Sequence, residues 1–314
     1  MRALELFAGG GGAAIGLRRA GFRATECVDG DPAAVATLRA AGLPGVWGWV
    51  GGGNPDAPTW VPELATVDLL WASPPCQPFS RAAIDPAGTA DPRNGWPATR
   101  SVVEYVRPTW IVVENVRDAP IHDWCADLSA MGYSFAYSFL DAADWGLPSH
   151  RSRWYIVAGP KGFRWPVPTH AGPDVPPLVR GVRLPWVGFG SVLWPGGCAS
   201  LPGEVEYDAV THPGAKSRPD LLLLPAAGVM CTEVKGTRAN PGNGWRFNGG
   251  PDRASDSAYL ATGRRRLTPG ECAALVGMSG HPWQSNKGDI YRQIGNVVAP
   301  VMAEAIGRAM LEQS

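Results

Sequence analysis

The 314-residue sequence predicts an α/β protein built on a doubly wound, Rossmann-like sheet. Three observations support this class. Short apolar segments alternate with segments of helical spacing through the first 160 residues, two of the apolar segments are hydrophobic at nearly every position, and a run of glycines separates the first of them from a helix. Hydrophobic residues make up 45% of the chain and charged residues 18%, which excludes a disordered chain and a coiled coil.

The elements of the first half follow from apolar runs and from helix start signals. Glycines end the first strand, and Pro32 stands in the first turn of the second helix. The segments VDLLWA and WIVVE have the composition of strands that are buried on both faces. In chain order we predict strands over 3–7, 24–29, 67–72, 110–114, 133–140 and 154–158, and helices over 13–20, 32–41 and 101–106.

The pattern changes in the second half of the chain. Between about residues 160 and 262, Pro, Gly and Trp dominate, with only short apolar runs. A capping-box pattern from Thr268 to Glu271 then predicts a helix to residue 276, and Pro300 opens a final helix to residue 311. We therefore predict a sheet domain over residues 1–164, a small irregular domain over 165–262, and a return segment over 263–314 that completes the sheet domain.

Charge and cysteine usage exclude several classes of protein. The chain carries 28 basic and 28 acidic side chains, so net charge favours neither a nucleic-acid nor a membrane partner, although the basic excess lies in the second half. Its six cysteines contain no C-x-x-C pair, which argues against a zinc knuckle and a disulfide framework. No apolar run is expected to span a membrane, and the amino terminus does not resemble a signal peptide. We expect a soluble, intracellular protein with reduced thiols.

Glycines 9–12 follow the first strand directly and precede a helix. A backbone turn of this kind lets a ligand approach closely at the positive end of a helix dipole. The next strand ends at Asp29, where an acid can accept hydrogen bonds from a ribose. Each feature alone also fits a simpler role, a tight turn for the glycines and a helix cap for Asp29 or Asp31. The sequence lacks a Gly-Lys-Ser/Thr motif, which excludes a phosphate-binding P-loop.

The octapeptide SPPCQPFS follows the buried strand 67–72, and ligand sites of α/β sheets lie at such strand ends. Two prolines fix the backbone directly before Cys76, which favours a reactive thiol over a packing role. Glu114, at the end of the strand 110–114, is the expected partner. Burial there favours the protonated carboxyl and would let it donate a proton. A lone Glu-Asn-Val segment also fits a surface turn.

With these segments in order, the chain resembles the DNA cytosine C5-methyltransferases. The resemblance covers nearly the whole chain except residues 165–255. The matching segments are Phe7-Ala8-Gly9-x-Gly11-Gly12, Pro74-Pro75-Cys76-Gln77, Asp91-Pro92-Arg93, Glu114-Asn115-Val116, Arg151-Ser152-Arg153, Arg266-Leu267-Thr268-x-x-Glu271-Cys272 and Arg292-Gln293-Ile294-Gly295-Asn296-Val297-Val298-x-Pro300.

The resemblance implies methyl transfer from S-adenosylmethionine to C5 of a cytosine flipped out of duplex DNA. Cys76 would add to C6 of the base and Glu114 would act at N3, since cytosine C5 is a poor nucleophile until the ring is activated. Arg153 would hold the O2 of the base, with support from Arg151. The residues implied for the cofactor are Phe7, Ala8, Gly9, Gly11, Gly12, Asp29, Pro74, Asn296 and Val298.

Three positions depart from the family pattern. Gly30 stands where a large apolar or aromatic residue is usual against the adenine, Trp49 where an aspartate is expected, and Ser149 where a glutamine is usual. We hypothesise that Trp47 or Trp49 restores the stacking that Gly30 cannot provide.

The resemblance also implies the nucleic-acid contacts. Residues 77–100 match a mobile catalytic loop, and residues 165–262 match the target-recognition domain. Between residues 210 and 266 the chain carries nine basic and four acidic side chains, which suits phosphate contacts but also fits a solvated basic loop. The expected DNA contacts are Gln77, Ser80, Arg81, Lys235, Arg238 and Arg246. We expect a monomer that needs no metal and no membrane and acts in the cytoplasm, associated with the nucleoid of a prokaryote or a phage-infected cell.

Alternative functions remain open. The first is an RNA cytosine C5-methyltransferase of the same fold, although the Cys-Phe-Thr signature usual in relatives that act on transfer RNA does not occur here. The second is a DNA-binding relative with weakened or lost catalysis, which the departures at the adenine pocket favour and the intact Cys76, Glu114 and Arg153 oppose. The third is transfer of a group other than methyl.

Overall fold

The structure is a computed structural model, and it describes residues 1–51, 56, 58–62, 67–79, 88–91, 93–173, 175–188 and 268–314. Most of the predicted target-recognition domain lies outside the described residues. Of the predicted DNA contacts, only Gln77 is described. The other five, Ser80, Arg81, Lys235, Arg238 and Arg246, lie outside.

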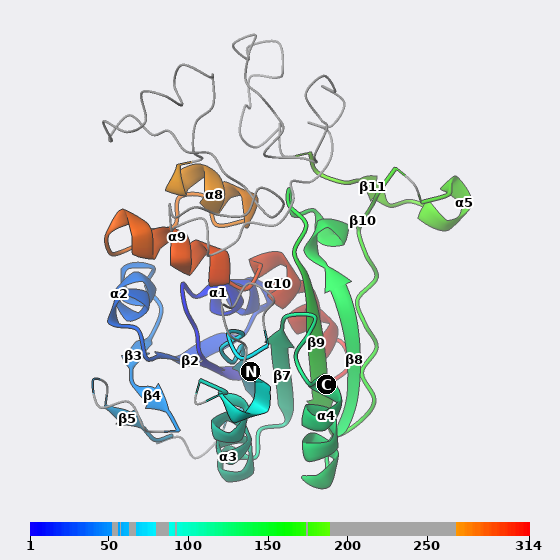
Figure 1. Ribbon diagram of the computed structural model, residues 1–314. Coiled ribbons are helices and arrows are strands. Elements are labelled where there is room, and N and C mark those ends of the chain that lie inside the picture. Colours follow the sequence, from blue (N-terminus) through cyan, green and yellow to red (C-terminus); the bar gives the residue numbers. More distant parts are fainter. Residues whose placement is uncertain are drawn as a thin grey trace, which may run out of the picture.

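A seven-stranded sheet forms the centre of the molecule, in the order β3-β2-β1-β6-β7-β9-β8 (Figure 1). The first five strands in this order are parallel, and β9 pairs antiparallel with both β7 and β8. The predicted doubly wound α/β class is thus confirmed. The strands are β1 (Arg2–Leu6), β2 (Arg23–Asp29), β3 (Gly45–Trp47), β6 (Leu69–Ala72), β7 (Trp110–Asn115), β8 (Ser134–Asp141) and β9 (Ser152–Gly159).

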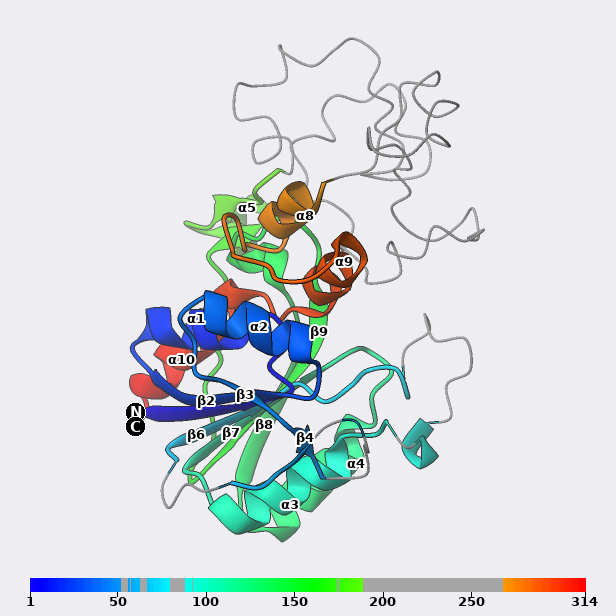
Figure 2. The same ribbon diagram turned by 90° about the vertical axis from the view of Figure 1, so that its left-hand side faces the viewer.

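The central strands are buried on both faces because helices cover both sides of the sheet (Figure 2). In β6, Leu70 belongs to one hydrophobic core, and Leu69 and Trp71 belong to the other. The helices α1 (Gly12–Ala20), α2 (Pro32–Ala40) and α10 (Pro300–Leu311) lie on one side, and α3 (Trp96–Val106) and α4 (Ile121–Ala130) on the other. This two-sided burial explains why β6 and β7 are apolar throughout.

The return segment completes the helical layer on the α1 side. The predicted capping box is present at the start of α8 (Pro269–Leu275), where Thr268 Oγ1 accepts from the Glu271 amide at 3.2 Å. Helix α9 (Lys287–Asn296), which was not predicted, follows, and α10 then packs along α1. By length and composition alone, the stretch Lys287–Leu311 could span a membrane. However, 67% of its apolar window is buried in the protein and it forms two separate helices.

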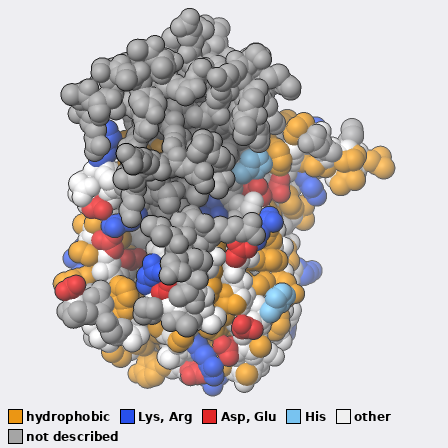
Figure 3. Space-filling model, viewed as in Figure 1, with side chains coloured by type: hydrophobic (Ala, Val, Ile, Leu, Met, Phe, Trp, Pro, Cys, Tyr) orange, Lys and Arg blue, Asp and Glu red, His pale blue; other side chains and the backbone are white. Residues whose placement is uncertain are grey.

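Smaller elements extend from this core. Strands β4 (Trp49–Val50) and β5 (Thr59–Trp60) pair beside β3, and β10 (His170–Ala171) pairs with β11 (Leu184–Pro185). A one-turn helix, α5 (Pro177–Arg180), lies between β10 and β11 on an arm that projects from the sheet domain. The surface of this arm is largely hydrophobic, with Leu178 and Val182 almost fully exposed (Figure 3).

Candidate active site

A cavity of about 780 Å³ opens at the carboxyl ends of β1, β2, β6 and β7, where ligand sites of doubly wound sheets lie. Because β9 runs antiparallel, its first residues reach the same edge. The cavity brings together twelve of the predicted site residues: Phe7, Ala8, Gly9, Asp29, Pro74, Cys76, Gln77, Glu114, Arg151, Arg153, Asn296 and Val298.

Gly11 and Gly12 do not line this cavity. Gly11 has a φ of 82°, and a Cβ there would lie 2.6 Å from a Leu43 methyl carbon. A Cβ at Gly12 would overlap the Val298 carbonyl oxygen. The two glycines therefore shape the turn and let the return segment pack on it. Phe7, the residue that leads into the turn, is held at a φ of 58°, which is costly for a residue with a side chain.

Asp29 holds the glycine turn in place. Its carboxylate accepts hydrogen bonds from the Gly9 amide at 2.7 Å and from the Asp31 amide at 2.8 Å. Burial raises the pKa of Asp29, and these two amide hydrogen bonds oppose that effect. A carboxylate has about four acceptor positions, so Asp29 keeps acceptor capacity for a ligand hydroxyl. Asp31, and not Asp29, caps α2, by accepting from the Ala33 amide at 2.9 Å.

Asn115 joins the two strand ends that carry Cys76 and Glu114. Its side-chain amide donates to the Pro74 carbonyl at 2.9 Å, and its carbonyl oxygen accepts from the Val116 amide at 2.9 Å. Asn115 is only 3% exposed, while the Cys76 thiol is half-buried at the cavity wall. The sequence predicted a role for Glu114 in the segment Glu114-Asn115-Val116, but none for Asn115. The buried strand end was the available signal, because a buried amide needs hydrogen-bond partners.

Glu114 is buried and forms an ion pair with Arg153, with 3.2 Å between Oε1 and Nε. Arg151 donates from both terminal nitrogens to the Gly295 carbonyl at 3.1 Å, and burial lowers its pKa to about 10. Asp141 fixes the approach to β9 by accepting from the Arg151 amide at 2.9 Å. Burial opposes ionisation of Asp141, but hydrogen bonds, led by that from His150, lower its pKa overall. Glu114, Arg151 and Arg153 therefore line the same cavity as the Cys76 thiol.

Of the three departures from the family pattern, the structure relates two, Gly30 and Trp49, to each other. A Cβ at Gly30 would lie 2.5 Å from the Trp49 ring, so the Trp49 indole fills the space of the missing side chain and lines the cavity. Trp47 is 41% exposed and does not line it, although its indole N–H donates to the Gly30 carbonyl at 3.3 Å. Ser149 is buried away from the cavity, where its hydroxyl donates to the Leu275 carbonyl at 2.7 Å.

Two buried polar atoms of cavity-lining residues lack a hydrogen-bond partner among the described residues. They are the donor Nε of Arg151 and the acceptor Oε1 of Gln293. Together with the acceptor capacity of Asp29 and the aromatic ring of Trp49, they suit a ligand with an aromatic base, hydroxyls and charged groups. S-adenosylmethionine has these groups. Gln293 and Arg292 line the cavity but were not predicted as site residues, although both stand in a segment that matches the family; only Asn296 and Val298 of that segment were assigned to the cofactor.

The family model described as C-5 cytosine-specific DNA methylase matches residues 1–177 and 227–312. Among curated proteins, the Type II methyltransferase M.NaeI of Lentzea aerocolonigenes is 29% identical, over 98% of this chain and 74% of its own. The Type II methyltransferase M.NgoMIV of Neisseria gonorrhoeae is 28% identical, over 98% of this chain and 96% of its own.

Solved structures share the fold at low sequence identity. The Entamoeba histolytica methyltransferase EhMeth matches with a TM-score of 0.66 at 16% identity, over 100% of this chain and 99% of its own. The S. pombe Dnmt2 methyltransferase matches with a TM-score of 0.63 at 17% identity, over 100% of this chain and 98% of its own. The family match, which spans most of the sequence, accords with the geometry of the cavity. This chain therefore belongs to the C-5 cytosine-specific DNA methylase family and uses S-adenosylmethionine as its methyl donor.

Proposed function

We propose that this methyltransferase modifies C5 of a cytosine flipped out of a specific duplex DNA sequence, through a covalent adduct with Cys76. One observation carries the proposal: Cys76, Glu114 and Arg153 line the same cavity as the glycine turn and Asp29. The names of the related Type II methyltransferases support DNA as the substrate.

The chemistry follows from the needs of the cytosine ring. The Cys76 thiolate forms a bond to C6, and the electrons of the C5–C6 double bond shift to a C4–C5 double bond as the protonated form of Glu114 supplies a proton at N3. Arg153 holds the O2 of the base and stabilises the charge that develops there. The activated C5 takes the methyl group, which leaves S-adenosylhomocysteine, and Glu114 takes back the N3 proton. Loss of the C5 proton to water then re-forms the C5–C6 double bond and expels Cys76 as a thiolate.

Residues of this chain would hold the cofactor around that centre. S-adenosylmethionine supplies an electrophilic methyl group when bound. Asp29 would accept from its ribose, and the turn after β1 would hold its methionine part together with Pro74, Asn296 and Val298. Trp49 would stack on its adenine. These residues enclose the cavity from both ends of the chain, so the glycine turn and the return segment are both required for binding.

Few of the residues proposed to contact nucleic acid are among those that the structure describes. Gln77 is exposed at the cavity and would contact the DNA, and residues 165–262 would read the target sequence. We further propose a monomer that acts in the cytoplasm, near the nucleoid, without a metal. The alternative substrate is RNA, and the experiment below distinguishes it from DNA.

A labelling experiment tests the proposal. The protein is incubated with labelled S-adenosylmethionine and either duplex DNA or RNA, and the label is located by nucleoside analysis. We expect 5-methylcytosine in DNA only. Label in RNA alone would favour the RNA alternative. Label on adenine, or none from a protein that still binds S-adenosylmethionine, would overturn the proposal, and the latter result would favour a relative without catalysis.

The role of Cys76 is tested with DNA that contains 5-fluorocytosine, which traps the adduct because the fluorine cannot leave as a proton does. We expect Cys76→Ser to lose trapping while it binds S-adenosylmethionine nearly as tightly as the wild type. The matched control is Cys125→Ala, which changes a buried thiol of α4 outside the cavity and should preserve trapping. Trapping by Cys76→Ser would exclude Cys76 as the nucleophile.

A further inference from the structure

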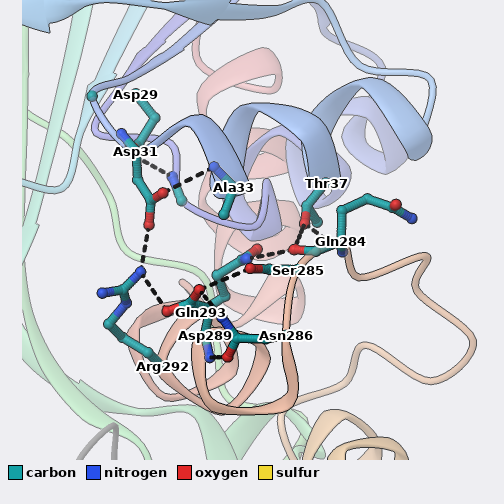
Figure 4. A network of polar contacts seen from close by, with 12 residues as sticks. Asp29, Asp31, Ala33, Thr37, Gln284, Ser285, Asn286, Asp289, Arg292 and Gln293 are labelled. Carbon is teal, nitrogen blue, oxygen red and sulfur yellow. Dashed lines mark hydrogen bonds and ion pairs between the residues drawn. The ribbon is translucent and has the colours of Figure 1, made fainter. Parts of the chain in front are cut away.

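Arg292, on α9, bridges two carboxylates at the wall of the cavity (Figure 4). Its Nη2 lies 2.8 Å from Asp31 Oδ2 and 3.0 Å from Asp289 Oδ1. Asp31 stands at the start of α2 and is 261 residues away in sequence. The ion pair therefore connects the return segment to the loop that follows β2.

This loop is the one that presents Asp29. The Asp31 amide donates to Asp29, and the Gly9 amide donates to the other oxygen of the same carboxylate. A continuous path of polar contacts thus runs from the glycine turn through Asp29 and Asp31 to Arg292. Burial of Asp29 favours its neutral form, and the positive charge of Arg292 opposes that tendency.

Helix α9 is held against α2 by contacts that do not involve Arg292. The Gln284 amide donates to Thr37 Oγ1 at 2.9 Å, and Gln293 Nε2 donates to the Gln284 carbonyl at 3.0 Å (Figure 4). Asp289 is fixed in turn, because Ser285 Oγ donates to its Oδ2 at 2.8 Å and Asn286 Nδ2 does so at 2.7 Å. The backbone of α9 should therefore remain in place when the Arg292 side chain is removed.

We propose that Arg292 is a positioning residue for cofactor binding, which holds the loop 29–31 in the geometry that Asp29 needs to accept from the ribose. This inference rests on the role of Asp29 in the proposed function. Since Arg292 acts through Asp31 and touches neither the thiol nor Glu114, its removal weakens the binding of S-adenosylmethionine without slowing the chemical step.

The test measures the Kd of S-adenosylmethionine by calorimetry, without DNA, together with kcat and KM. Arg292→Ala should raise both Kd and KM about threefold to tenfold and leave kcat at saturation within twofold, because a half-exposed ion pair makes a modest contribution. Arg292→Lys should restore part of the affinity. Asp31→Asn, which keeps an oxygen for the Ala33 amide, should raise Kd similarly. The variant that carries both substitutions should have a Kd no higher than that of the single variant that binds more weakly.

The matched control is Arg308→Ala, which removes an exposed arginine that pairs with Glu304 on α10, outside the cavity, and should leave Kd unchanged. An unchanged Kd in Arg292→Ala, fully additive effects in the double variant, or a loss confined to kcat would each overturn the inference. Because the calorimetric arm needs no nucleic acid, a failure to find 5-methylcytosine in DNA would contradict the proposed function and leave this test valid.

Discussion

The Trp49 indole packs directly against Gly30, at a position where any larger residue would collide with the ring. The aromatic surface of the cavity is thus provided from β4 rather than from the end of β2. We expect the Trp49 ring to provide the stacking surface for the adenine that Gly30 cannot provide.

Trp49→Ala should therefore weaken S-adenosylmethionine binding about twofold to tenfold, the contribution typical of aromatic stacking. Trp49→Phe should retain most of the affinity. Trp47→Ala is the matched control, because Trp47 is more exposed and does not line the cavity. Calorimetric Kd values check this, and unchanged binding in both alanine variants would exclude a stacking role for either tryptophan.

Asn115→Ala should lower kcat by about 10- to 100-fold, because the hydrogen bond to the Pro74 carbonyl aligns the loop of Cys76 with Glu114. The KM for S-adenosylmethionine should change much less. Steady-state kinetics and the rate of 5-fluorocytosine trapping measure the effect. A kcat equal to that of the wild type would mean that the prolines alone position Cys76.

Gly12→Ala should destabilise the protein by about 1–3 kcal/mol or prevent it from folding, since the new Cβ meets the backbone of Val298 rather than a flexible side chain. Gly162→Ala serves as the control, because no atom lies within 4 Å of a Cβ there, and it should change stability by less than about 0.5 kcal/mol. Urea unfolding monitors both variants. Equal stabilities would show that the return segment can shift away from the turn.

Glu5→Gln should flatten the dependence of stability on pH. Glu5 is 3% exposed and accepts from the Ala14 amide at 3.0 Å, and burial raises its pKa from 4.5 to about 8. Between these values the folded state holds a proton that the unfolded state has lost, so the wild type should lose stability as pH rises, by at most about 1.4 kcal/mol per pH unit. Urea unfolding at pH 5 to 8 checks the slope, and parallel curves for both proteins would contradict the prediction.

The sequence predicted those parts of the fold that local patterns determine. The helix Pro300–Leu311 has the predicted bounds, because a proline opens it and its apolar positions are regular. Helix α9 was missed because its polar, glycine-containing sequence, KGDIYRQIGN, has weak helical preference, and the contacts to α2 stabilise it. Strand β3 was missed because it has only three residues.

In the site, too, local patterns predicted some residues, whereas others depend on contacts between distant parts of the chain. Cys76 and Glu114 were predicted because each stands in a motif at the end of a buried strand. Arg292 and Asn115 also stand in matched segments, but their hydrogen-bond partners are 261 and 41 residues away and become neighbours only in the folded chain. The local patterns do not contain these contacts, so the roles that we propose for the two residues follow from the structure.

The close packing of Gly12 under the Val298 carbonyl also bears on the time at which the enzyme becomes active. The backbone that packs on the glycine turn is synthesised almost 290 residues after the turn itself, roughly 15–60 s later at ordinary rates of synthesis. During that interval the nascent chain carries Cys76, but the cavity around it is incomplete. Cofactor binding should therefore begin only after residue 298 has been synthesised.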